Sequence, residues 1–162
     1  MKNETSEKNN LIKELESFLT KGHAHVTFNG AIKNIPFEDL GKKPGDLPYS
    51  IWQITEHIRI TQKDILDFSI NKNYKELNWP DDYWPKNTAP KDEAEWNNCI
   101  KIINDDLDEF IQLLRDAEDL YKPFEHGNGQ TLLREAMVIA DHTSYHTGEI
   151  LVLRRLLGNW KK

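Results

Sequence analysis

Two histidines on one predicted helix carry the clearest chemical signal in the sequence. His142 and His146 are four residues apart in the segment 141–149, which reads DHTSYHTGE, so their rings leave the same helix face one turn apart. This spacing allows two imidazoles to reach one metal ion. Apolar residues flank that face along the helix, so the rings are predicted to point inward, where a polar group without a partner costs about 1–3 kcal/mol.

A third histidine, His57, borders the apolar stripe of another predicted helix, between Ile54 and Ile58. Three neutral imidazoles suit zinc, nickel, iron or cobalt and leave a coordination position open for water or substrate. The pattern alone leaves two alternatives open. The histidines can form a buried hydrogen-bond network, or the spacing can be a coincidence on a surface helix. In a network, the partners would be Glu149, Asp141 or Tyr145.

Other reactive residue types are weaker candidates. His25 could approach the site as a substrate-binding or outer group if the first two helices are antiparallel. His126 lies in a Gly-rich loop before the last predicted helix, and His142 lies about 16 Å along that helix, so His126 is not expected to be a ligand. Cys99 is the only cysteine, which excludes an internal disulfide and a CxxC metal site. It lies at helical spacing with apolar neighbours and is predicted to be a buried core residue.

Four helical stretches must position these side chains. Apolar residues recur at three and four positions over 7–34, from Ser50 to about 69–71, from Pro90 to about Leu114, and over 131–157. Gly22 is predicted to interrupt the first stretch. Ser50 and Gln53 fit a capping box, Thr27 can cap a second piece of the first stretch, and Gly158 can stop the last helix. Without period-two strands, the sequence predicts one all-α, four-helix-bundle domain over residues 1–162, with residues 1–6 as a flexible tail.

Two long connections interrupt the helices. The link before Ser50 and the loop 71–90 both leave room for a crossover, so a simple up-down order is not required. The loop contains Trp79, Tyr83 and Trp84 among prolines. These aromatics either cover one end of the bundle or form a lid over a pocket.

Composition limits the classes of partner. The chain has 162 residues and a net charge of −6, and its basic residues are scattered rather than gathered in a patch. A nucleic-acid partner is therefore not expected. No apolar run approaches the ~20 residues that span a bilayer, and residues 1–10 are polar. We therefore expect no membrane association and a cytoplasmic location.

Two segments together resemble a known superfamily. Residues 50–58, SIWQITEHI, resemble the second-helix motif of the DinB-like superfamily, and residues 141–150, DHTSYHTGEI, resemble its DHxxYHxGQ motif on the fourth helix. The resemblance implies a four-helix bundle with an up-down-down-up course. It also implies a divalent metal site on His57, His142 and His146. Zinc or nickel is the expected ion, with iron, cobalt and manganese as further candidates.

The chain departs from the motif at Glu149, where the family pattern often has glutamine. A carboxylate there could be a fourth ligand or a general base. The superfamily includes thiol-dependent transferases and isomerases as well as metal-dependent hydrolases. The resemblance therefore implies a metal-dependent enzyme, either a thiol-dependent S-transferase or a hydrolase.

Its expected substrate is a small molecule, such as a low-molecular-weight thiol, with Glu149 transferring the proton. The alternatives are a non-catalytic metal-binding or stress-response module and a bundle with purely structural histidines. A homodimer that pairs through an exposed helix face is also expected.

Overall fold

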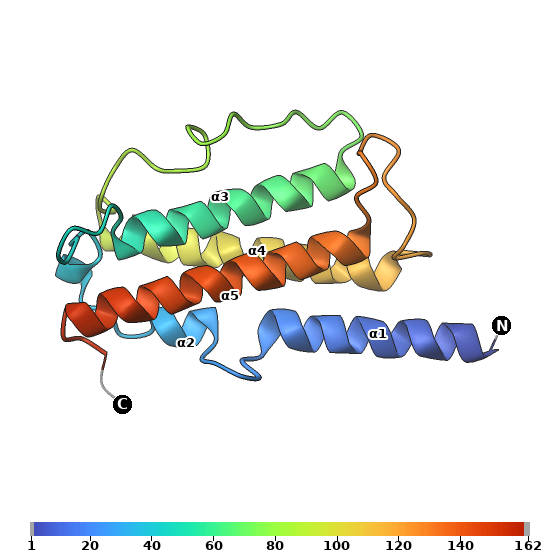
Figure 1. Ribbon diagram of the computed structural model, residues 1–162, viewed down its shortest axis with the longest axis horizontal. Coiled ribbons are helices and arrows are strands. Elements are labelled where there is room, and N and C mark those ends of the chain that lie inside the picture. Colours follow the sequence, from blue (N-terminus) through green and yellow to red (C-terminus); the bar gives the residue numbers. More distant parts are fainter. Residues whose placement is uncertain (1, 161–162) are drawn as a thin grey trace.

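The computed structural model describes residues 2–160, and this part of the chain is helical without a β-strand. Four long helices pack as a bundle, and two short elements lie between the first two (Figure 1). The predicted all-α bundle is therefore confirmed. None of the helices, over the residues described, is long and apolar enough to cross a membrane. The elements are α1 (Lys2–Thr20), α2 (Phe28–Ile32), the 3-10 helix η1 (Phe37–Asp39), α3 (Ile51–Ile70), α4 (Glu93–Asp116) and α5 (Leu132–Leu156).

The long helices follow an up-down-down-up course, as the resemblance implied. Helices α1 and α5 run in one direction along the bundle, and α3 and α4 run in the opposite direction (Figure 1). Helix α3 packs against both α4 and α5, and α1 contacts the same two helices. Because α3 and α4 are parallel neighbours, the chain between them must return along the bundle. The connection 71–92 makes this return and lies along α3.

Side-chain caps explain where several helices begin. The Ser50 hydroxyl accepts from the backbone N–H of Gln53, and the Gln53 side chain accepts from the backbone N–H of Ser50. This completes the predicted capping box. The Thr27 hydroxyl accepts from the N–H of Gly30 at the start of α2, also as predicted. Gly158 has a φ of +74° just after α5, a conformation that favours glycine and ends the helix.

Helix α1 differs from its expected bounds. It begins at Lys2, within the segment 1–6 for which a flexible tail was expected, and ends at Thr20. The break at Gly22 is confirmed. A Cβ on Gly22 would lie 2.0 Å from the carbonyl oxygen of His25, so the tight turn there admits only glycine.

Two apolar clusters make up the core, and α3 and α5 contribute residues to both of them. On α5, Ile139 belongs to one cluster and Ile150 to the other. The segment between these two isoleucines contains both histidines of the predicted site. Cys99 lies within the second of these clusters and is 2 % exposed. Burial, aided by a hydrogen bond with Glu56, raises the pKa of its thiol, which confirms Cys99 as a core residue.

Candidate metal centre

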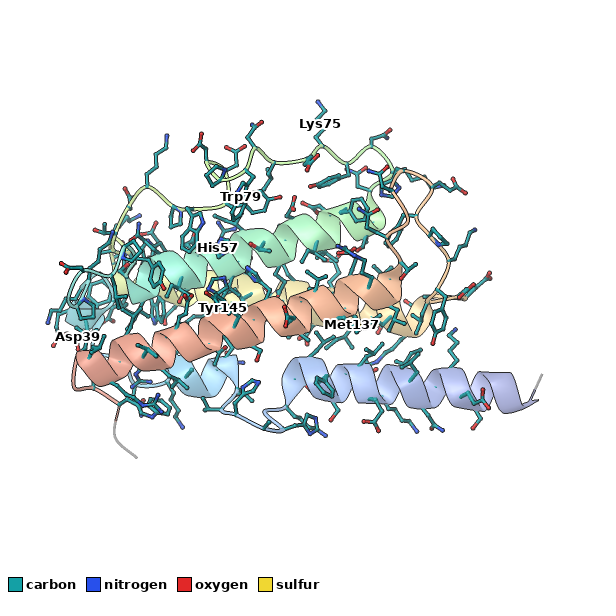
Figure 2. The ribbon with its side chains drawn as sticks, in the orientation of Figure 1. Asp39, His57, Lys75, Trp79, Met137 and Tyr145 are labelled. Atoms are coloured by element: carbon teal, nitrogen blue, oxygen red, sulfur yellow. The ribbon has the colours of Figure 1, made fainter. Side chains whose placement is uncertain are left out.

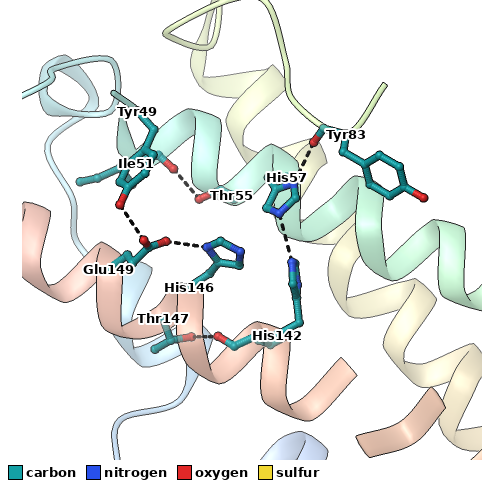
Figure 3. A network of polar contacts seen from close by, with 10 residues as sticks. Tyr49, Ile51, Thr55, His57, Tyr83, His142, His146, Thr147 and Glu149 are labelled. Carbon is teal, nitrogen blue, oxygen red and sulfur yellow. Dashed lines mark hydrogen bonds and ion pairs between the residues drawn. The ribbon is translucent and has the colours of Figure 1, made fainter. Parts of the chain in front are cut away.

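Three histidines from two helices converge between the core clusters. Helix α3 carries His57, and α5 carries His142 and His146 (Figure 3). One ring nitrogen of each lies within 4.8 Å of the other two. The Nε2 atoms of His57 and His142 are 3.1 Å apart. Among the described residues, this is the one group of three or more His, Cys, Asp or Glu side chains that could hold a metal ion, so the predicted cluster is confirmed.

The helix registers turn these rings inward. His57 is 3 % exposed and His146 is 6 % exposed, while His142 is partly buried. The antiparallel packing of α3 on α5 brings the three rings to the same level of the bundle. A chance arrangement on a solvated helix surface is therefore excluded.

Hydrogen bonds on the outer side of two rings fix which nitrogen carries the proton. His57 Nδ1 lies 2.8 Å from the carbonyl oxygen of Tyr83, and His146 Nδ1 lies 2.6 Å from Oε2 of Glu149 (Figure 3). Both oxygens accept, so each Nδ1 is the donor. In the neutral tautomer, Nε2 of each ring carries a lone pair, and Nε2 of His57 lies 3.1 Å from Nε2 of His142. Outer partners of this kind orient the imidazole ligands of metal sites.

Burial favours the neutral form of two of the rings, His57 and His142. Desolvation lowers the pKa of His57, despite an opposing hydrogen bond to Tyr83. Desolvation, followed by repulsion from His146 and His57, lowers the pKa of His142 to about 3. Only a neutral imidazole offers a lone pair to a metal. The donor set is therefore three nitrogens, which suits zinc, nickel, cobalt or iron better than magnesium or calcium.

Glu149 is bound to the cluster from the side of α5. One carboxylate oxygen accepts from His146, and the other accepts from the Tyr49 hydroxyl at 2.6 Å. The hydrogen bond to Glu149, together with burial, raises the pKa of Tyr49 to about 12. Glu149 therefore holds the His146 ring in place, and both of its oxygens have partners. Its assignment as a fourth ligand or a proton-transfer group stays a prediction.

Aromatic rings from outside the two helices cover His57. The Trp84 ring stacks on the His57 imidazole with centroids 4.0 Å apart and planes 5° apart. Tyr49 stacks in turn on Trp84, with centroids 6.1 Å apart. Trp79, in contrast, is 71 % exposed. The aromatic residues of the loop therefore differ in their positions. Trp84 covers His57, whereas Trp79 is exposed and does not cover the histidines.

The carboxylate of Asp64 on α3 holds the loop 71–92 through two hydrogen bonds. Asp64 accepts from the Tyr83 hydroxyl at 2.8 Å and from the Tyr74 hydroxyl at 2.6 Å. Burial and the bond to Asp64 raise the pKa of both phenols. Asp64 is seven residues after His57, on the same face of α3. The Tyr83 residue thus spans two turns of helix, with its carbonyl on His57 and its hydroxyl on Asp64.

The remaining histidines lie outside the cluster. His25 contacts the Ser144 hydroxyl at 3.0 Å, which places it against α5 but not among the three rings. His23 contacts the Ser17 hydroxyl. His126 binds a backbone carbonyl of α3 at 2.8 Å, and it is not a ligand in this arrangement, as expected.

The whole-length comparison agrees with the motifs. Residues 4–161 match a family model described as the DinB family. This span contains all three clustered histidines and every helix from α2 to α5. No curated protein and no solved structure matches the chain.

Proposed function

We propose that this chain, which belongs to the DinB family, holds one divalent metal ion on His57, His142 and His146 and uses it in an enzymatic reaction on a small molecule. One observation carries the proposal. The outer nitrogens of His57 and His146 donate hydrogen bonds, so their inner lone pairs are directed to the same small space as His142. Structural histidines need only one such partner, whereas metal ligands need the second nitrogen free.

A zinc or nickel ion at this position supplies Lewis acidity, which activates water or a thiol and stabilises negative charge. The chain's own groups prepare the site for it. Glu149 orients His146, and the Tyr83 carbonyl orients His57. Trp84 covers one side of His57 and keeps water from that face.

The reaction class that we propose is hydrolysis or transfer to a low-molecular-weight thiol. The thiol must come from outside, because Cys99 is buried and its raised pKa keeps it protonated. Glu149 is our candidate for proton transfer. It is half-buried beside the cluster, and it could accept a proton by releasing the Tyr49 hydroxyl, its partner on the other oxygen.

The test is elemental analysis of the untagged protein after loading with zinc or nickel. We expect about one equivalent in the wild type, and its loss in His57→Ala and in His146→Ala. His23→Ala is the matched control, because that ring contacts Ser17 away from the cluster. A wild type that takes up no metal, or variants that retain it, would refute the site.

Activity assays then separate the reaction classes. Loaded protein would be screened with ester, amide and electrophilic substrates, each with and without a small thiol. Turnover that needs the thiol identifies a transferase, and turnover without it identifies a hydrolase. Tight metal binding without turnover in any class would favour a non-catalytic metal-binding module.

A further inference from the structure

One face of helix α5 is exposed to solvent along most of the helix. The helix is apolar around most of its circumference, a property of helices that are covered on all sides. In the bundle it packs on α3, α1 and α2. It crosses the front of the molecule in Figure 1, and Figure 2 labels Tyr145 and Met137 along it. We call the exposed stripe the open face of α5. Its members are Met137, Asp141, Tyr145, Gly148, Val152, Arg155 and Leu156.

This stripe is more apolar than a solvated face. Met137 is 60 % exposed, Tyr145 is 64 % exposed and Leu156 is 60 % exposed. They lie on one side of a single helix, and the charged residues Asp141 and Arg155 lie between them along the strip. Large exposed apolar residues gathered on one helix face are typical of a protein–protein contact.

The charges on the open face would be complementary to those of a second α5 helix that runs antiparallel to it. Asp141 precedes Gly148 by seven residues, and Arg155 follows Gly148 by seven residues. At 100° per residue, both point within about 20° of the Gly148 direction. Over the described part of the chain, neither Asp141 nor Arg155 has an ion-pair partner. A second α5 running antiparallel across Gly148 would place each Asp141 opposite an Arg155.

Gly148 lies at the centre of this symmetry. A Cβ at this position would meet no atom within 4 Å, so the fold of one chain does not require glycine there. Glycine on an exposed helix face does allow another helix backbone to approach closely. Two-fold pairing brings the two Gly148 residues together, because the same patch serves both copies.

We propose that two copies of this chain pair through antiparallel α5 helices, with Gly148 at the two-fold axis. Asp141 of each copy then pairs with Arg155 of the other. Tyr145 of one copy lies at the level of Val152 of the second, so the apolar members of the strip cover each other. The interface lies directly behind the histidine cluster, because the Tyr145 ring packs edge-on to His146 at 4.9 Å. This proposal does not depend on metal binding.

Sedimentation equilibrium of the untagged protein tests the pairing. We expect the wild type to be a dimer and Gly148→Trp to be a monomer with unchanged helical content. The open space around Gly148 lets the variant fold, so a loss of dimer reports the interface and not unfolding. A monomeric wild type at every concentration, or a dimer that survives Gly148→Trp, would overturn the proposal.

Charge reversal tests the register. Asp141→Arg and Arg155→Asp, made singly, each place like charges opposite each other twice in the dimer. Each should therefore weaken dimerisation by about tenfold or more. The two reversals together should restore it, while Asp108→Arg, on an exposed position of α4, should change nothing. A double reversal that stays as weak as the single ones would refute the antiparallel register.

Discussion

Replacing Asp64 with alanine should disturb the histidine cluster from two helical turns away. The carboxylate accepts hydrogen bonds from the hydroxyls of Tyr74 and Tyr83, at 2.6 Å and 2.8 Å. A hydrogen bond to a charged group contributes about 1.5–3 kcal/mol, and both phenols are partly exposed, so water replaces part of each loss. We therefore expect Asp64→Ala to lower the free energy of unfolding by about 2–3 kcal/mol. In a chain of this length, that is a fall in Tm of about 4–12 °C.

The effect on the metal site separates Asp64 from an ordinary stabilising residue. Losing the Tyr83 anchor frees the carbonyl that holds His57 Nδ1 at 2.8 Å. Loss of an outer partner of a metal-binding histidine lowers metal affinity by about 10–100-fold. Tyr83→Phe should reproduce this loss of affinity. Tyr74→Phe, which removes the other bond to Asp64, should lower stability and leave the affinity nearly unchanged.

Competition with a chromophoric chelator would measure zinc affinity, and urea unfolding of the metal-free proteins would measure stability. Zinc affinity should fall in Asp64→Ala and Tyr83→Phe but not in Tyr74→Phe, whereas stability should fall in Tyr74→Phe as well. Wild-type zinc affinity in a clearly destabilised Asp64→Ala protein would refute the role of Tyr83 in orienting His57. Equal losses of affinity in Tyr74→Phe and Tyr83→Phe would refute it as well.

Further predictions concern protonation and the start of α3. Burial lowers the pKa of His57 and His142 below 6.5 in the folded chain, so the unfolded state binds more protons below that pH. The metal-free protein should therefore lose up to about 1.4 kcal/mol per ring and pH unit as the pH falls from 6.5. His142→Asn should flatten this slope in urea unfolding, and an unchanged slope would contradict the assignment. Glu149→Gln should let the pKa of Tyr49 fall from about 12 toward 10, seen as phenolate absorbance at lower pH, whereas an unaltered titration would disprove the coupling. Ser50→Ala removes the capping hydroxyl of α3 and should cost about 0.5–2 kcal/mol in thermal unfolding, with no loss if the cap is dispensable.

The sequence predicted the helices and the three histidines because both leave periodic signals. Four-residue spacing placed His142 and His146 on one face, and the apolar stripe around His57 turned it inward. The cap at Ser50 set the register of α3 within one residue. These features depend on local geometry, which a helix repeats along its length.

The contacts that orient the rings left no such signal. The Tyr83 carbonyl is a backbone group in an irregular loop, and any residue there supplies one. Trp84 could be recognised as an aromatic in a long loop, but its stacking on His57 depends on the path of residues 71–92. The seven-residue spacing of Asp64 from His57 marks a common helix face, yet its tyrosine partners come from that loop. Tyr49, which binds Glu149 from 100 positions away, is likewise unpredictable from spacing.

The distance along the chain between the clustered histidines has a consequence for biosynthesis. His57 and His142 are separated by 85 positions, and two of the three rings belong to the last helix. The ribosome must therefore have released the chain through His146 on α5 before the three nitrogens can meet. A nascent chain that ends before α5 carries only His57 of the cluster, so it cannot trap a metal ion in a half-made site. Metal capture on the three histidines would thus follow the synthesis of α5 rather than nucleate the packing of the earlier helices.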